Sequence, residues 1–265
     1  MSANVTNLMA RLGCVGLGLV LMGQAEPTLA GTFSTSLTRV SLSASAPSAV
    51  LKLRNEGNAI LRLQVSVFAW QQTASGEMQL APTTDVVFFP ALLTLGPGEE
   101  RKIRIGTTAG FGSTEKPYRM FFDELPSHDP APHGVRMRTR VSLPVFVGGA
   151  SAAANVEIDD VRLHGATLTF RLRNLGAAHL PPGELEVSAT NAAGRTVVTD
   201  RVKNWYVLPG GERLHEIVIP SDACLQIRRL AVAGRFASLT LEQTAEATSV
   251  ACGADQAQSA DPRGE

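Results

Sequence analysis

The sequence predicts an all-β protein with two immunoglobulin-like β-sandwich domains joined at an angle. Short runs in which apolar and polar residues alternate occupy most of the chain, and Gly, Pro and Asn separate them. One pattern of runs and turns occurs twice, in the same order. About seven short strands per ~110-residue unit, with turns roughly every 8–12 residues, are typical of this fold. No segment has the apolar stripe of a long helix.

Residues 1–30 are expected to be a signal peptide. They contain one basic residue, Arg11, then an apolar stretch over 12–22, and they end in small residues at Ala30. The apolar stretch has about half of the ~20 residues that a transmembrane helix needs, so a membrane anchor is the less favoured alternative. We therefore expect an exported chain that begins near Gly31 and does not span a membrane.

The repeated pattern divides the chain into two domains. Residues 51–57 (LKLRNEG) recur as 170–176 (FRLRNLG), and 95–101 (LGPGEER) resemble 208–213 (LPGGER). Two matches in the same order indicate two copies of one unit, with convergent turn chemistry as the alternative. The expected boundaries are 31–148 for the N-terminal domain and 149–252 for the C-terminal domain. The polar segment 253–265 is expected to be disordered.

Strands are expected wherever apolar and polar residues alternate, as over 61–69, where the odd positions are apolar. In the first domain the expected strands are 49–55, 61–69, 86–89, 102–107, 118–125 and 135–147. In the second domain they are 166–174, 184–190, 195–202, 215–220 and 237–243. Glycine-rich turns separate them, and the glycine- and alanine-rich segment 148–154 is the expected hinge between the domains.

Charge and cysteine content restrict the possible functions. The chain has 24 basic and 24 acidic residues, and this balance argues against a general nucleic-acid binder. Loss of the signal peptide would remove Cys14 and leave Cys224 and Cys252. In an oxidising compartment these two cysteines are predicted to form a disulfide, and two free buried thiols are the alternative.

The sequence shows no constellation of catalytic or metal-binding residues. The five histidines are scattered without the spacing of metal ligands, and we expect them on the surface or in loops. Asp159 and Asp160 are adjacent, so in a strand they are expected to point to opposite faces and not to share a proton. No nucleophile elbow occurs. We therefore expect no enzyme activity, no metal and no cofactor.

Four stretches resemble the periplasmic pilus chaperones of the chaperone–usher pathway. They are 37–40 (LTRV), 89–99 with FP and LGPGE, 115–126 (EKPYRMFFDELP) and 138–147 (RTRVSLPVFV). The third is the most specific, and the likeness covers the first domain much better than the second. The resemblance implies a periplasmic protein whose partners are pilus or fimbrial subunits and an outer-membrane usher. It leaves open whether the free protein dimerises to cover its exposed strand.

The resemblance also implies that the chaperone lends a strand of its own to each subunit. From residue 135 onward, apolar odd positions alternate with arginines at 136, 138 and 140, so one face is apolar and the other cationic. An ordinary core strand is the alternative. The predicted donor residues are those of the apolar face, Val135, Met137, Thr139 and Val141.

In the family, an arginine of the first strand and a lysine of the last hold the terminal carboxylate of the subunit. Arg39 matches the arginine, whereas Ser142 occupies the position of the lysine. We expect Arg140, two residues earlier on the same face, to replace it, because a guanidinium binds a carboxylate through two hydrogen bonds.

Arg104 and Glu115 fall where family members place charges that orient the two domains. They are predicted to form a structural charge pair, although Phe146 occupies the position of their partner in the last strand. Two other classes remain open. One is a two-domain adhesin or carbohydrate-binding module, which would need an exposed aromatic platform. The other is an exported hydrolase, for which no nucleophile and base are visible.

Overall fold

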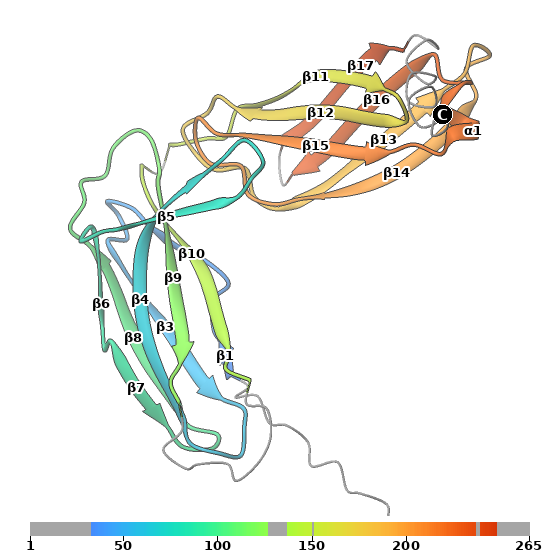
Figure 1. Cartoon of the computed structure of the whole chain (residues 1–265). Coiled ribbons are helices and arrows are strands. Elements are labelled where there is room, and N and C mark those ends of the chain that lie inside the picture. The colour runs from blue at the N-terminus through green and yellow to red at the C-terminus, as the bar shows by residue number, and fades with distance from the viewer. Residues whose placement is uncertain (1–32, 127–136, 150, 237–238, 248–265) are drawn as a thin grey trace, which may run out of the picture.

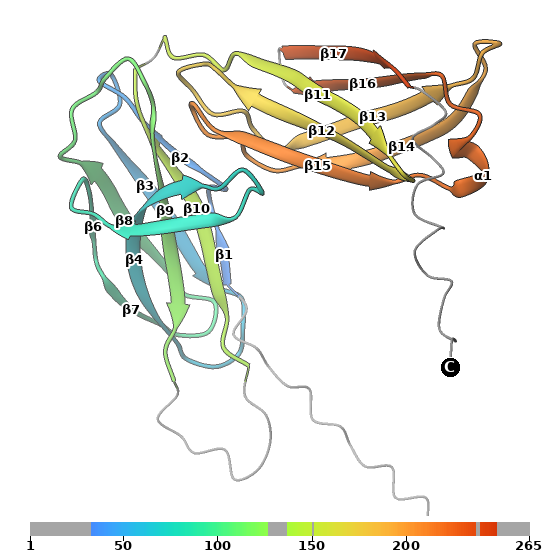
Figure 2. The ribbon, with the colours of Figure 1, turned by 45° about the horizontal axis from the view of Figure 1, so that its top comes forward.

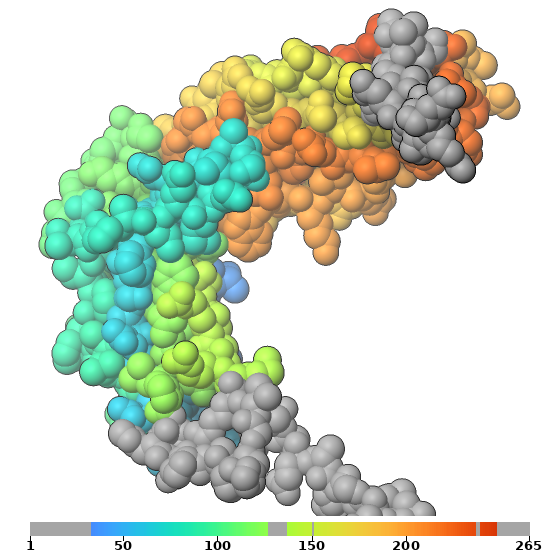
Figure 3. Space-filling view, in the orientation of Figure 1, coloured from blue at the N-terminus to red at the C-terminus, as the bar shows by residue number. Residues whose placement is uncertain are grey.

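Two β-sandwiches lie at an angle to each other in the computed structural model, which describes residues 33–126, 137–149, 151–236 and 239–247 (Figure 1). The predicted all-β fold is therefore confirmed. The two lobes border an open concave side (Figure 3). The expected signal peptide, 1–30, and the expected disordered tail, 253–265, lie outside the described residues.

The first domain consists of two sheets with the strand orders β1-β3-β8-β6 and β2-β10-β9-β4-β5, and β7 pairs with β4. Leu53 and Ile103 of the first sheet pack against Leu63, Phe122 and Val145 of the second in one buried core. The strands are β1 Phe33–Thr35, β2 Val40–Leu42, β3 Ser48–Asn55, β4 Leu61–Gln72, β5 Met78–Pro82, β6 Val86–Phe89, β7 Leu92–Leu95, β8 Glu100–Thr107, β9 Lys116–Glu124 and β10 Arg140–Val147.

The second domain consists of the sheets β11-β12-β15 and β14-β13-β16-β17. Phe170, Leu172, Leu185, Val187 and Val232 belong to the core between them. Its elements are β11 Val156–His164, β12 Thr167–Asn174, β13 Gly183–Thr190, β14 Thr196–Asn204, β15 Glu212–Val218, α1 Ser221–Cys224, β16 Arg229–Phe236 and β17 Leu239–Glu246.

A buried asparagine joins the two parts of the repeated pattern in each domain. In the first domain the Nδ2 of Asn55 donates to the carbonyl of Leu95 (3.1 Å), and its Oδ1 accepts from the amide of Gly57 (2.9 Å). In the second, Nδ2 of Asn174 donates in the same way to Val207 (3.0 Å). The side-chain amide satisfies backbone groups where the chain leaves the sheet, so the strand end and the distant turn recur together.

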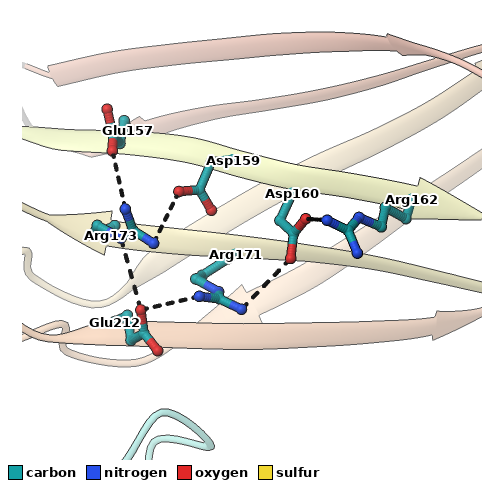
Figure 4. Close-up of polar contacts among 7 residues, drawn as sticks. All are labelled: Glu157, Asp159, Asp160, Arg162, Arg171, Arg173 and Glu212. Carbon is teal, nitrogen blue, oxygen red and sulfur yellow. Dashed lines mark hydrogen bonds and ion pairs between the residues drawn. The ribbon is translucent and has the colours of Figure 1, made fainter.

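The second domain departs from the sequence prediction at two strands. The structure contains β11 and β16, which the sequence analysis did not predict. β11 has a bulge between Asp159 and Arg162. Asp160 has a positive φ of 57° there. Because the bulge breaks the alternation, the two adjacent carboxylates do not point apart as expected. Both pair with arginines of β12: Asp159 with Arg173 (3.3 Å) and Asp160 with Arg171 (3.5 Å) (Figure 4).

His215 is buried, contrary to the expectation that the histidines lie on the surface or in loops. Its ring stacks on Phe170 with centroids 4.9 Å apart, and its Nε2 lies 3.2 Å from Oδ1 of Asn204. Burial, and then the charge of Arg213, lower the pKa of His215 to about 4. The ring is therefore neutral at pH 7.

We predict that acid destabilises the second domain through His215. Because the pKa is lowered in the folded state, the unfolded chain takes up the proton first as the pH falls. Stability that is complete above about pH 6.5 is lost toward pH 4, by up to about 3 kcal/mol. Urea unfolding of His215→Gln at pH 7 and pH 4 should lack this component, whereas the exposed control His164→Gln should keep it. An equal acid loss in both variants would contradict the assignment.

Candidate functional site

One edge of β10 is open over part of its length. β9 pairs with β10 along its whole length, but β2 pairs with it only over Val145–Val147. From Arg140 to Pro144, no strand of the described part of the chain covers the second edge. Unpaired N–H and C=O groups at such an edge are a template for another strand.

The predicted donor residues lie at and before the start of β10. Leu143 and Val145, on the same face of the strand, are in the core of the domain. Toward the start of the strand this face becomes less covered: Val141 and Thr139 are half-buried, and Met137 is 67% exposed. Val135 lies outside the described residues. The apolar face thus runs from the domain's own core to an exposed methionine.

The sequence analysis predicted that Arg140 and Arg39 hold one carboxylate together. The structure does not place these two arginines at the same level of the sheet. Arg39 immediately precedes the segment of β2 that pairs with β10, so it is level with Pro144. Arg140 is four residues away along β10, which corresponds to about 13 Å. It also forms an ion pair with Asp123. Arg140 is therefore not level with Arg39 and has a partner of its own.

Arg119 is a second arginine that lies level with Arg39. It lies on β9 directly opposite Pro144, so Arg119 and Arg39 flank the same residue of β10. Its side chain is only 4% exposed, and its Nε has no hydrogen-bond partner. Its Cζ lies 4.4 Å from the ring centroid of Trp70 and 5.9 Å from that of Trp205. A charged residue within the apolar run YRMFF was the sequence signal for this site.

No acidic side chain of the described residues forms an ion pair with Arg119 or Arg39. Arg39 is exposed. Burial lowers the pKa of Arg119. Burial raises the pKa of Tyr206, and the charges of Arg39 and Arg119 oppose this rise, so both arginines act on the same phenol. Burial of a charge without a partner is costly. The arrangement therefore favours an anion, such as a carboxylate, at this place.

The two domains are joined by Glu115 and His179, not by the predicted pair of Arg104 and Glu115. Nδ1 of His179 lies 2.6 Å from Oε1 of Glu115, and both side chains are largely covered. The His179 ring stacks on Phe146 with centroids 3.7 Å apart. Arg104 is exposed on β8. Glu115 thus lies at the interface as expected, but an aromatic stack replaces the missing charge at Phe146.

Comparison with known proteins identifies the first domain. Residues 32–151 match the model of the pili and flagellar-assembly chaperones, PapD N-terminal domain. This match spans the first domain, which is less than half of the chain. The match includes the open edge of β10, Arg39 and Arg119. None of the curated proteins compared matches the chain.

Solved structures of pilus chaperone systems share the fold of both domains. A chain of the CsuC–CsuE chaperone–tip adhesion subunit pre-assembly complex from Acinetobacter baumannii has a TM-score of 0.55 and 19% identity, over 82% of this chain and 99% of that chain. A chain of the Salmonella enterica SafA pilin–SafB chaperone complex has a TM-score of 0.55 and 14% identity, over 82% and 98%. The E. coli chaperone DraB has a TM-score of 0.52 and 16% identity, over 81% and 99%.

Other predicted sites of the chain are only partly described. Cys224 is buried in α1, but Cys252 lies outside the described residues, so their pairing stays a prediction. Within the described part of the chain, no group of three or more His, Cys, Asp and Glu could hold a metal ion. No helix there has the length and apolar content to cross a membrane.

We predict that Phe146 stabilises the junction of the two domains. It is 1% exposed and belongs to a buried cluster with Trp70, Tyr206 and Leu208. Phe146→Ala should lower the free energy of unfolding by about 3–5 kcal/mol, because it leaves a cavity. The same change at Phe89, which is 75% exposed, should cost less than about 0.5 kcal/mol. Urea unfolding measures both, and equal effects would contradict the role of Phe146.

Proposed function

We propose that this chain is a periplasmic chaperone that binds pilus or fimbrial subunits, lends them a β-strand and delivers them to an outer-membrane usher. The family of the first domain supports a chaperone role in pilus assembly. Likeness to chains from the CsuC–CsuE and SafA–SafB complexes supports pilus subunits as the partners. The proposed role is non-enzymatic. It consists of binding the subunits, protecting them and transferring them to the usher.

The open edge of β10 is the observation that carries this proposal. Its unpaired backbone from Arg140 to Pro144 offers hydrogen bonds to a strand of the subunit, in the manner of β-strand addition. The apolar face ahead of it presents Met137. The alternation of the sequence predicts Val135 for the same face. Each such side chain contributes about 1.5–3 kcal/mol when it is fully buried in the groove of a subunit.

The second part of the proposal is the anchor for the terminal carboxylate of the subunit. Arg39 immediately precedes β2 and Arg119 lies on β9, so they flank β10 at one level, about 10 Å apart at the backbone. Arginine side chains are long enough to reach one ligand from this separation, and the charges of both influence Tyr206. Each guanidinium offers paired donors to a carboxylate. Arg119 thus supplies the second positive charge, which family members place as a lysine at the position of Ser142.

An adhesin that binds sugars through an aromatic platform is less well supported. Trp70, Tyr118 and Tyr206 are buried, and Trp205 is the only Trp or Tyr with a large exposed fraction, 46%. Three of the four candidate platform residues are therefore unavailable to a ligand.

We predict that Met137→Glu abolishes subunit binding, because it places a charge in an apolar groove. Co-expression with a pilin-like subunit and purification should give a one-to-one complex with the native chaperone. The control Leu92→Glu changes an exposed apolar residue away from β10 and should retain the subunit. A complex that survives Met137→Glu would refute strand lending. So would a native chaperone found only as a monomer beside soluble, stable subunits.

We predict that Arg39→Ala and Arg119→Met each weaken subunit binding by about 2 kcal/mol or more, because each removes a partner of a desolvated carboxylate. Arg140→Ala should have a much smaller effect, because its ion pair with Asp123 is exposed. Calorimetry with folded variants and a subunit measures these differences. If Arg140→Ala weakens subunit binding as much as Arg39→Ala does, Arg140 is part of the anchor and this assignment is wrong.

A further inference from the structure

The side chain of Gln72 links the two domains at the last residue of β4. Its Nε2 donates to the carbonyl of Tyr206 (2.9 Å), and its Oε1 accepts from the amide of Leu208 (3.1 Å). A single side-chain amide thus binds one acceptor and one donor of the same segment, as a peptide group of a neighbouring strand would. Gln72 holds the segment Trp205–Leu208 of the second domain against the first.

The turn of the β4–β5 hairpin adds to this contact. The hairpin extends from the first domain to the edge of β15 (Figure 2). There the amide of Leu214 donates to the carbonyl of Ala74 (2.9 Å). Arg213 packs on Gly76, where a Cβ atom would lie 2.5 Å from its Nη1. The hydrogen bonds of Gln72 therefore belong to a larger set of contacts that hold the β4–β5 hairpin against the second domain.

The held segment forms one wall of the site around Arg119. The guanidinium lies between the ring of Trp70, from its own domain, and the ring of Trp205, from the second domain. The rings of Trp205 and Tyr206 meet edge to face, with centroids 5.2 Å apart. Because Trp205 is 46% exposed, little packing holds it from the solvent side. Its backbone continues directly into Tyr206 and Leu208, the two residues to which Gln72 is hydrogen-bonded.

We infer that Gln72 is a positioning residue for a carboxylate site at Arg119, which it completes by holding Trp205 and Tyr206 in place. The inference rests on the proposed anchor and extends it to the second domain. The aromatic wall excludes water, and hydrogen bonds between a guanidinium and a carboxylate are stronger in such surroundings. The ligand class is an organic carboxylate, of which the C-terminus of a subunit is one case.

The experiment uses the full chain with acetate as the probe and acetamide as its neutral counterpart. The Nε–H signal of Arg119, assigned in NMR spectra by its loss in Arg119→Lys, should shift with acetate and not with acetamide. Gln72→Ala should weaken acetate binding about fivefold, the difference between a desolvated and an exposed charged hydrogen bond. Gln71→Ala is the matched control, since Gln71 is the exposed neighbour on the same strand, and should bind acetate normally.

Trp205→Ala tests the wall without changing the link between the domains. It should reproduce the loss of acetate affinity seen in Gln72→Ala while leaving thermal unfolding as in the native chain. Normal acetate affinity in either variant would overturn the inference, and so would an Arg119 signal that ignores acetate in a chaperone that still binds subunits. If Arg119 responds to acetate but no subunit co-purifies, the carboxylate site stands and the proposed chaperone function fails.

Discussion

A buried cation that has no acidic partner among the described residues is the constraint on which the junction of the two domains depends. Arg119 lies among Trp70, Trp205 and Tyr206, and the acidic residues nearest to its strand are engaged elsewhere: Glu115 with His179 and Asp123 with Arg140. Burial of a lone guanidinium costs free energy that packing around it must offset. Binding of an anion would remove that cost, so the same arrangement that weakens the isolated chain favours a ligand.

The strand β10 has three distinct surfaces, each with its own task. Its odd residues from Leu143 to Val147 fill the core of the first domain. Its even residues face the junction, where Phe146 stacks on His179. Its second edge is covered by β2 only at the end of the strand. One strand can therefore stabilise its domain, join the other domain and still offer backbone groups to a partner.

The interface between the domains uses polar contacts around a small apolar cluster. Glu115 and His179 form one of these contacts, and Gln72 with the β4–β5 hairpin forms another. Each polar contact alone contributes little free energy. Together they fix Trp205 of the second domain relative to Trp70 of the first. These directional contacts lie where the two lobes meet at an angle in Figure 1.

The sequence by itself determined the all-β fold, most strands of the first domain and the repeated Asn motif, because alternation and turn chemistry are local properties. It missed β11, where a bulge breaks the alternation, and it did not predict that His215 is buried. Only the tertiary structure decided the partners of Arg140, Glu115 and Arg119. Strand register and domain placement set those partners, and both arise from contacts between residues far apart in the chain.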